Sequence, residues 1–121
     1  MRVIVTGSMG WTDEAAIRRE LVKLPPGSTV IHGDAPGADM IAGQIACELG
    51  FAVEALAKNG EDYRRYRRAA WKGLNERMLD SGADLVLAFH AELGEPGKAR
   101  GSGHLVDLAR QRGIEVRGFR A

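Results

Sequence analysis

Residues 3–10 read Val-Ile-Val-Thr-Gly-Ser-Met-Gly, and this stretch decides the fold. A short β-branched run that ends in glycine is typical of a strand buried on both faces. After the glycine loop, the hydroxyl of Thr12 is expected to cap a helix, and the acids Asp13 and Glu14 suit its first turn. The stretch therefore predicts a buried strand, a glycine-rich loop and a helix in that order.

Strand and helix patterns alternate along the rest of the chain. We expect further strands at residues 29–31, 51–56, 85–89 and 114–119, and further helices at residues 38–49, 62–80 and 102–112. This alternation predicts right-handed βαβ units and a parallel sheet. We therefore expect one three-layer, Rossmann-like α/β domain over residues 1–121. Its sheet should hold about five strands in the order 3-2-1-4-5, with helices on both faces.

Some positions of single residues follow from these patterns. Residues 85–89 are the most apolar segment and are expected at the centre of the sheet, whereas Glu54 interrupts its strand and indicates a place nearer an edge. Asp62 is expected to cap the long helix. Cys47 falls in an apolar helical pattern and is predicted to be a core residue.

Composition limits the function classes. The 17 basic and 16 acidic residues leave a formal charge of +1, which does not favour a dedicated nucleic-acid binder. One cysteine excludes an intrachain disulfide, and three histidines without close spacing do not predict a metal site. No apolar run approaches the roughly 20 residues that span a membrane, and no signal peptide is recognised. We expect a cytoplasmic protein without membrane contact.

Three glycine-bearing loops are expected at the carboxyl ends of strands, and each opens into a helix. They are residues 6–10, 32–39 and 100–103. Helix N-termini present unpaired N–H groups and partial positive charge, and glycine lets the backbone approach a ligand closely. Glycine also serves tight turns, but three such loops at one edge favour a phosphate site. None is a Walker P-loop or a complete G-x-G-x-x-G.

Several motifs occur in a fixed order: Val-Thr-Gly-Ser at 5–8, Trp-Thr-Asp at 11–13, His-Gly-Asp-Ala-Pro-Gly-Ala-Asp at 32–39, Leu-Asn-Glu-Arg-Met at 74–78 and Gly-Ser at 101–102. With them the chain resembles the SLOG superfamily of Rossmann-like nucleotide-binding domains. Within it, the chain is most similar to the small single-domain YspA-like branch of bacteria and phages. The resemblance covers nearly the whole chain and implies a nucleotide or nucleotide-derived ligand.

Three positions depart from the pattern of these relatives. Asp34 stands where the branch typically has glycine, and Leu74 stands where it has arginine. Related phosphoribohydrolases, which cleave nucleoside 5′-monophosphates, carry Gly-Thr-x-x-Glu with a glutamate that takes part in the chemistry. Leu105 occupies that position here. The changes at Leu74 and Leu105 argue against the same hydrolysis.

The predicted ligand-binding residues come from the three loops and their surroundings, and from the helix over residues 62–80, which the resemblance implies points toward the loops. They are Gly7, Ser8, Trp11, Gly33, Asp34, Gly37, Ala38, Asp39, Asn75, Gly101, Ser102 and Gly103. Trp11 is a candidate for base stacking, for a lid or for a loop anchor. Asn75 is a candidate for ligand contact or for a tie between helix and loop. No cofactor is expected besides the nucleotide as ligand.

Asp34 and Asp39 are the candidate catalytic residues. Asp39 could cap a helix or bind a ribose hydroxyl, and Asp34 could act as an acid or base or repel a wrong ligand. Two carboxylates beside a sugar suit the chemistry of a glycosidic bond. A nucleotide sensor or sequestering module is the first hypothesis. An enzyme that cleaves or transfers an N-glycosidic bond of a nucleotide is the second.

A run of basic residues, Arg64-Arg65-Tyr66-Arg67-Arg68, supports a third hypothesis. It is a solvated helix face, or it binds single-stranded nucleic acid together with Trp71. Nearly balanced total charge makes this the least favoured reading. Trp71 could instead lie in a subunit interface, where aromatic residues and arginine are enriched. We expect a homo-oligomer, a dimer or larger.

Overall fold

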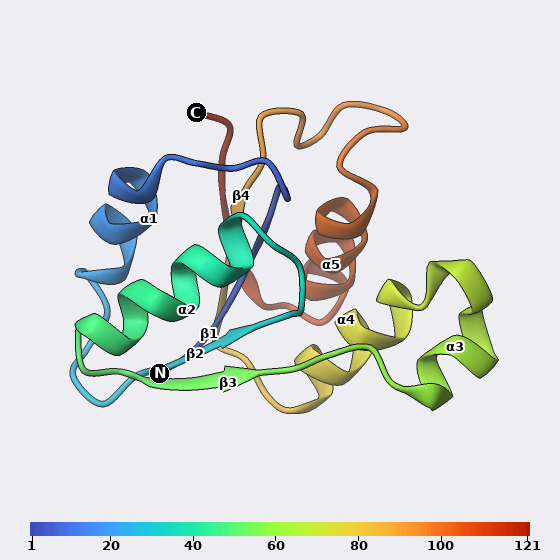
Figure 1. The fold of residues 1–121 in the computed structure, drawn as a ribbon, viewed down its shortest axis with the longest axis horizontal. Coiled ribbons are helices and arrows are strands. Elements are labelled where there is room, and N and C mark those ends of the chain that lie inside the picture. Colours follow the sequence, from blue (N-terminus) through green and yellow to red (C-terminus); the bar gives the residue numbers. More distant parts are fainter.

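A computed structural model describes residues 1–121 and confirms the α/β class and the strand order. Five parallel strands form one sheet in the order β3-β2-β1-β4-β5 (Figure 1). The strands are β1 (Arg2–Gly7), β2 (Thr29–His32), β3 (Ala52–Ala55), β4 (Leu85–Phe89) and β5 (Glu115–Phe119). The strand order has its switch point between β1 and β4, because the chain adds β2 and β3 on one side of β1 and then β4 and β5 on the other. Open α/β sheets bind ligands at such a switch point.

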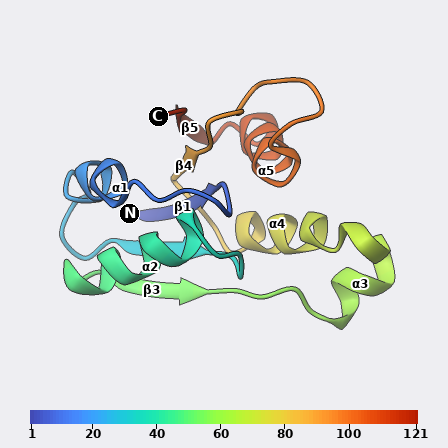
Figure 2. The same ribbon diagram turned by 45° about the horizontal axis from the view of Figure 1, so that its top comes forward.

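The helices cover both faces of the sheet. They are α1 (Glu14–Leu21), α2 (Ala38–Glu48), α3 (Gly60–Tyr66), α4 (Trp71–Asp80) and α5 (Arg100–Gln111), with a 3-10 turn η1 (Arg67–Ala69) between α3 and α4. Residues of α1 and α2 pack on one face of the sheet and residues of α4 and α5 on the other, and Figure 2 shows α3 beyond the carboxyl end of β3.

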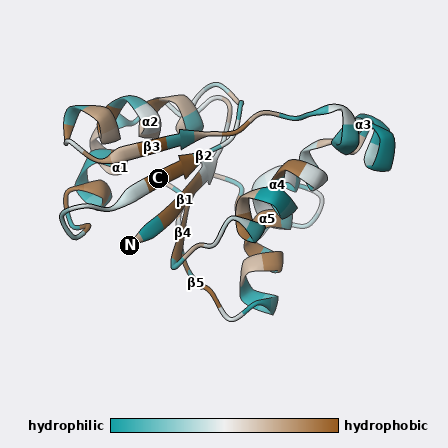
Figure 3. Cartoon of the chain, turned by 90° about the horizontal axis from the view of Figure 1, so that it is seen from below, coloured by the Kyte–Doolittle hydropathy of each residue, from teal (hydrophilic) through white to brown (hydrophobic).

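Alternate residues of the strands build two separate cores. Val3, Val5 and Leu87 pack with α1 and α2 in a cluster of 15 buried residues. Ile4 and Val86 face the opposite way and pack with α4 and α5 in a smaller cluster of eight. Figure 3 shows the apolar strands between helices whose outer surfaces are polar. This period-two arrangement is the one expected for a sheet covered on both faces.

The predicted strand positions hold. β4 has the predicted bounds, is buried along its whole length and lies between β1 and β5. β3 is an edge strand, as the charge of Glu54 indicated, and Arg2 forms an ion pair with that carboxylate at 2.9 Å. The expected cap was wrong by one residue: the N-cap of α1 is Asp13, not Thr12, because the Asp13 carboxylate accepts a hydrogen bond from the amide of Ala16.

The prediction of one helix over residues 62–80 was wrong. Arg67 has φ 55° and ψ −120°, a backbone conformation that cannot continue a helix, so α3 ends there and α4 begins at Trp71. Asn59, not Asp62, is the N-cap of α3. No glycine or proline marks this break, so the local sequence does not indicate it.

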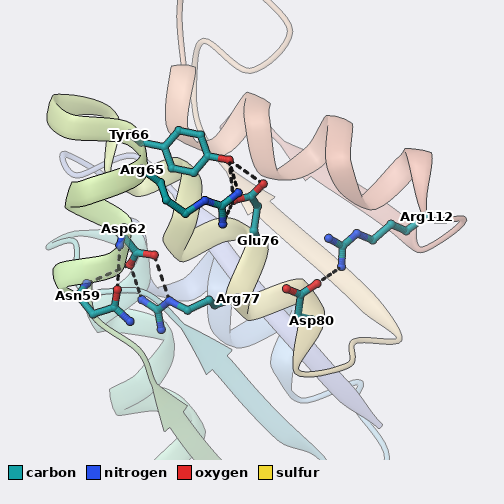
Figure 4. A network of polar contacts seen from close by, with 8 residues as sticks. All are labelled: Asn59, Asp62, Arg65, Tyr66, Glu76, Arg77, Asp80 and Arg112. Carbon is teal, nitrogen blue, oxygen red and sulfur yellow. Dashed lines mark hydrogen bonds and ion pairs between the residues drawn. The ribbon is translucent and has the colours of Figure 1, made fainter.

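Asp62 instead joins α3 to α4. Its carboxylate accepts from the amide of Asn59 at 3.0 Å, which completes a capping box, and it forms an ion pair with Arg77 at 2.6 Å (Figure 4). Gly73 gives it room, since a Cβ there would collide with the carboxylate. The positive guanidinium of Arg77 lowers the pKa of Asp62, despite the opposing effect of burial.

Cys47 was predicted to be a core residue, and this was wrong as well. It lies on the exposed face of α2, while Ile45 and Ala46 are buried. The apolar pattern of α2 is broad enough that its inner face cannot be assigned by spacing alone.

Candidate functional site

A pocket of about 330 Å³ lies at the carboxyl edge of the sheet. All three predicted loops contribute to its wall, together with the inner side of α4. Seven of the predicted residues line it: Gly7, Gly33, Asp34, Asp39, Asn75, Gly101 and Ser102. The fold thus brings segments from near residue 7, residue 33 and residue 101 to one place, as parallel strands require.

Backbone hydrogen bonds join the first loop, residues 6–10, to β4 and to the second loop, residues 32–39. The amide of Ser8 donates to the carbonyl of Phe89 at 2.9 Å, and the carbonyl of Ser8 accepts from the amide of Ala38 at 3.1 Å. A Cβ at Gly7 would collide with the Phe89 carbonyl and lie 2.6 Å from the Cβ of Ala38. Gly37 has φ 76° and a carbonyl of the first loop beside it. Ser8, Gly37 and Ala38 therefore shape the loops and do not line the pocket.

Trp11 also lies outside the pocket. Its ring is buried and meets Phe89 edge-on at 5.6 Å between ring centroids. The indole Nε1 donates to the carbonyl of Asp13 at 2.9 Å. Of the roles considered for Trp11, these contacts are those of a loop anchor.

Two polar contacts fix the start of α5 against its neighbours. The hydroxyl groups of Thr6 and Ser102 share a buried hydrogen bond of 3.1 Å. The amide Nδ2 of Asn75 donates to the carbonyl of Gly101 at 3.0 Å and lies 3.1 Å from Nδ1 of His104. Because Nδ2 can only donate, Nδ1 of His104 accepts and Nε2 carries the proton. Asn75 therefore ties helix to loop while it lines the pocket.

The two predicted carboxylates both line the pocket but differ in environment. Burial raises the pKa of Asp39 to about 7, although the backbone amides of Ala35 and Gly33 oppose the rise. Partial burial also disfavours the charge on Asp34, but Lys58 outweighs it and lowers the pKa of that carboxyl. Lys58 contacts Asp34 through Nζ at 2.7 Å and through its amide at 3.1 Å. One carboxyl is thus held charged while the other gains its proton near neutrality.

The N-terminus of α5 forms another part of the pocket wall. Ala99 precedes the helix in the left-handed conformation and supplies no side-chain cap. Arg100, Gly101 and Ser102 line the pocket, so the first turn presents backbone donors and one guanidinium there. Gly103 lies one step further along and lines a neighbouring groove instead.

Several lining residues were absent from the predicted site. Lys58 comes from the segment after β3, which also ends at this edge, so the rule for parallel strands could have found it. Leu74 and Met78 form an apolar side from one face of α4. Thr6, Met9, Ala35, Trp71, His90, Ala99 and Arg100 complete the wall.

The basic run is not a uniform charged face. Arg64 pairs with Glu61 at 2.7 Å, and Arg65 lies 3.6 Å from Glu76. The hydroxyl of Tyr66 donates to the same Glu76 (Figure 4). Because of the break at Arg67, these arginines and Trp71 do not lie on one continuous helix.

No group of three His, Cys, Asp or Glu side chains is placed to hold a metal ion. His32 is buried, with Nδ1 2.7 Å from the carbonyl of Gly33. Among the helices, none combines the length and the apolar character that a membrane crossing needs.

Comparison with known proteins gives two matches. Residues 1–66 match the family described as YspA, cpYpsA-related SLOG family. The chain is also 34% identical over 125 residues to the Gene 61 protein of Mycobacterium phage D29, and the alignment covers 98% of this chain and 95% of the phage protein. The second match extends past β3 to the helices α4 and α5 that complete the pocket.

Proposed function

The chain belongs to the YspA, cpYpsA-related SLOG family, and from this premise we propose that its pocket binds a nucleotide or a nucleotide-derived ligand. The observation that carries the proposal is the convergence of three βα loops and the uncapped start of α5 on one pocket of about 330 Å³. At the level of the family, nucleotide binding or processing is what the SLOG membership indicates.

The charges of the wall orient such a ligand. A phosphate fits the first turn of α5, where Gly101 allows close approach and Arg100 supplies a positive charge. Ribose hydroxyl groups fit beside Asp34 and Asp39, whose carboxyl oxygens can accept hydrogen bonds from them. Leu74 and Met78 provide apolar contact for a base, as small-molecule pockets commonly do.

A sensor or sequestering role is favoured by the side chains of Leu74 and Leu105, the two positions at which this chain lacks the residues expected of the hydrolases. Leu105 is fully buried in the smaller core and cannot contact a ligand. Leu74 is an apolar part of the pocket wall where relatives are expected to carry a positive charge. Binding without rapid turnover is therefore the favoured form of the proposal.

The experiment is a thermal-shift and calorimetry screen of the four common nucleoside 5′-monophosphates against the wild type, Gly101→Ala and Gly60→Ala. A Cβ at Gly101 meets nothing in the protein, so the fold tolerates it, but it blocks the approach of a phosphate to the backbone. Gly60 also begins a helix and has room for a Cβ, but it lies outside the pocket.

We expect at least one monophosphate to raise the melting temperature of the wild type and of Gly60→Ala. Gly101→Ala should weaken the binding about tenfold or more, which equals about 1.4 kcal/mol. Absence of binding by every monophosphate, or equal binding to all three proteins, would contradict the proposed site.

A second function is favoured by the different proton affinities of Asp39 and Asp34. A protonated Asp39 could donate to the leaving base while the Asp34 carboxylate takes a proton from water, so that the C1′–N bond breaks and a C1′–O bond forms. Chromatography for free base tests it. Release by the wild type that Asp39→Asn abolishes would support catalysis, and release that Asp39→Asn leaves intact would remove Asp39 from it. No contact favours the nucleic-acid hypothesis over these two.

A further inference from the structure

We propose that the ligand of this pocket carries additional phosphate groups, and that these lie in a basic groove next to it. The inference rests on the proposed function and names the class of nucleotide more closely. Its basis is the geometry and charge of a second hollow of about 640 Å³ between the start of α5, the beginning of α4 and the segment 93–98.

The pocket and the groove meet at shared residues. Trp71, Ala99 and Arg100 line both of them. A group bound at the first turn of α5 is therefore beside the groove as well as inside the pocket. A chain of phosphates that begins at this turn can continue past Arg100 without crossing another part of the fold.

The groove holds more positive charge than its acids neutralise. Lys72, Arg100 and Arg110 line it, and none of the three forms an ion pair within the chain. Asp107 is the one acid of the groove without an ion-pair partner, since Glu95 pairs with Arg120 at 3.3 Å. Unpaired cations at a concave surface favour an anion.

His104 adds a neutral donor to this groove. Asn75 holds its Nδ1 as an acceptor, which leaves the proton on Nε2. Burial and the nearby ammonium of Lys72 lower the pKa of His104, so the ring stays neutral at physiological pH. Phosphate oxygens accept from such N–H groups as well as from ammonium and guanidinium groups.

The contrast with the pocket decides where an anionic extension goes. In the pocket, Lys58 is already paired with Asp34, whereas the groove offers Lys72 and Arg110, which have no ion-pair partner. The ligand class is therefore a nucleotide with two or more phosphate groups. These groups can come from a polyphosphate chain on one nucleoside or from the phosphodiester of a short oligonucleotide.

The test compares three probes for each of the four common ribonucleosides: the 5′-monophosphate, the 5′-triphosphate and the 5′-phosphorylated dinucleotide. Calorimetry measures their affinity for the wild type, for Lys72→Gln/Arg110→Gln and for Arg19→Gln/Arg68→Gln. The control pair removes two positive charges that also lack ion-pair partners but lie outside the pocket and the groove.

We expect the triphosphate or the dinucleotide to bind the wild type about tenfold or more tightly than the monophosphate of the same base. Lys72→Gln/Arg110→Gln should lose most of this gain and keep its affinity for the monophosphate, while the control pair keeps the gain. A gain for the triphosphate alone assigns the groove to a polyphosphate chain, and a gain for the dinucleotide alone assigns it to an oligonucleotide.

Two results would overturn this inference and leave the proposed function intact. One is equal affinity for the monophosphate and both longer probes. The other is a gain that Lys72→Gln/Arg110→Gln retains in full. If no probe of any kind binds the wild type, the proposed function and the inference fail together.

Discussion

At the scale of single residues, one buried carboxyl group in the pocket wall, that of Asp39, lowers the stability of the fold. Asp39 is 7% exposed and has no cation in contact with it, yet it lies in the wall of the candidate site. A buried carboxyl of this kind is maintained at functional sites even where a neutral side chain would favour folding.

Replacement of Asp39 by Asn should change how stability depends on pH. The unfolded carboxyl ionises near 3.8 and the folded one near 7, so the folded state binds more protons between these values. The free energy of unfolding of the wild type should therefore fall as pH rises from about 4 to 7. Asp39→Asn lacks this fall and should be about 1–3 kcal/mol more stable than the wild type above neutrality. Urea unfolding between these pH values measures the difference.

Asp34→Asn is the matched control for this prediction. Lys58 lowers the pKa of Asp34, so its charged form stabilises the fold above the ordinary carboxyl pKa, and that contribution is lost as the pH falls through the folded value. Asp34→Asn should therefore destabilise the protein at neutral pH. Stability curves of Asp39→Asn and wild type that run parallel would show that Asp39 is ionised throughout.

The glycine loops could be predicted from the sequence, but the chemical surroundings of each residue could not. Gly7, Gly33 and Gly101 follow strands or open helices, and the parallel-sheet rule brings them to one edge. The sequence does not show that Trp11 turns inward onto Phe89, or that Asp39 is buried while Asp34 meets Lys58. These outcomes depend on distances between segments that are far apart in the chain.

At the scale of elements, the link between α3 and α4 stores backbone strain. Arg67 takes a positive φ with ψ −120°, a combination that glycine adopts far more readily than a residue with a Cβ. The Asn59 cap and the Asp62–Arg77 ion pair hold α3 in place on either side of this strain. Figure 4 shows both contacts beside the Arg65, Tyr66 and Glu76 cluster.

Arg67→Gly should therefore stabilise the protein, by about 1 kcal/mol. Arg68→Gly is the matched control, since Arg68 is the next residue and has no positive φ. Glycine there only adds freedom to the unfolded chain, so that variant should be unchanged or less stable. Thermal unfolding of both variants measures the effect. Equal destabilisation by both would mean that position 67 is not strained in solution.

The link between α3 and α4 also shows why some element boundaries could be predicted from the sequence and others could not. The β4 strand was found with its true bounds because a continuous apolar run has few alternatives. The helix over 62–80 was not divided because every residue near Arg67 is compatible with helix, and the contact of Asp62 with Arg77 across the break joins residues 15 positions apart. Local sequence carries the first kind of information and not the second.

At the scale of the whole molecule, stability should be unequal between the sheet centre and α3. β1 and β4 are buried on both faces and pair with each other along Val3–Gly7 and Leu85–Phe89. In α3, Asp62 is the one buried residue. Elements with few buried contacts open at lower free energy than the core of a domain.

Native-state hydrogen exchange should therefore be slowest for the amides of β1 and β4 and fastest, among the helices, for those of α3. Mass spectrometry of peptides that cover each element measures the order. The proposed nucleotide should slow exchange at the start of α5 and leave α3 unaffected, because α3 lies outside the pocket. Exchange in α3 as slow as in β4 would mean that the chain opens only as one unit.

The two edge strands, β3 and β5, are the places where another copy of the molecule could add a strand to the sheet. β3 and β5 each leave one side of their backbone unpaired, and such a side can recruit another strand into a growing ladder. Here β3 carries Glu54 beside Arg2, and β5 carries the pair Glu115 and Arg117. A foreign strand added at either border would have to strip water from these charges. These charges therefore disfavour the edge-to-edge strand addition to which flat, uncharged borders are prone.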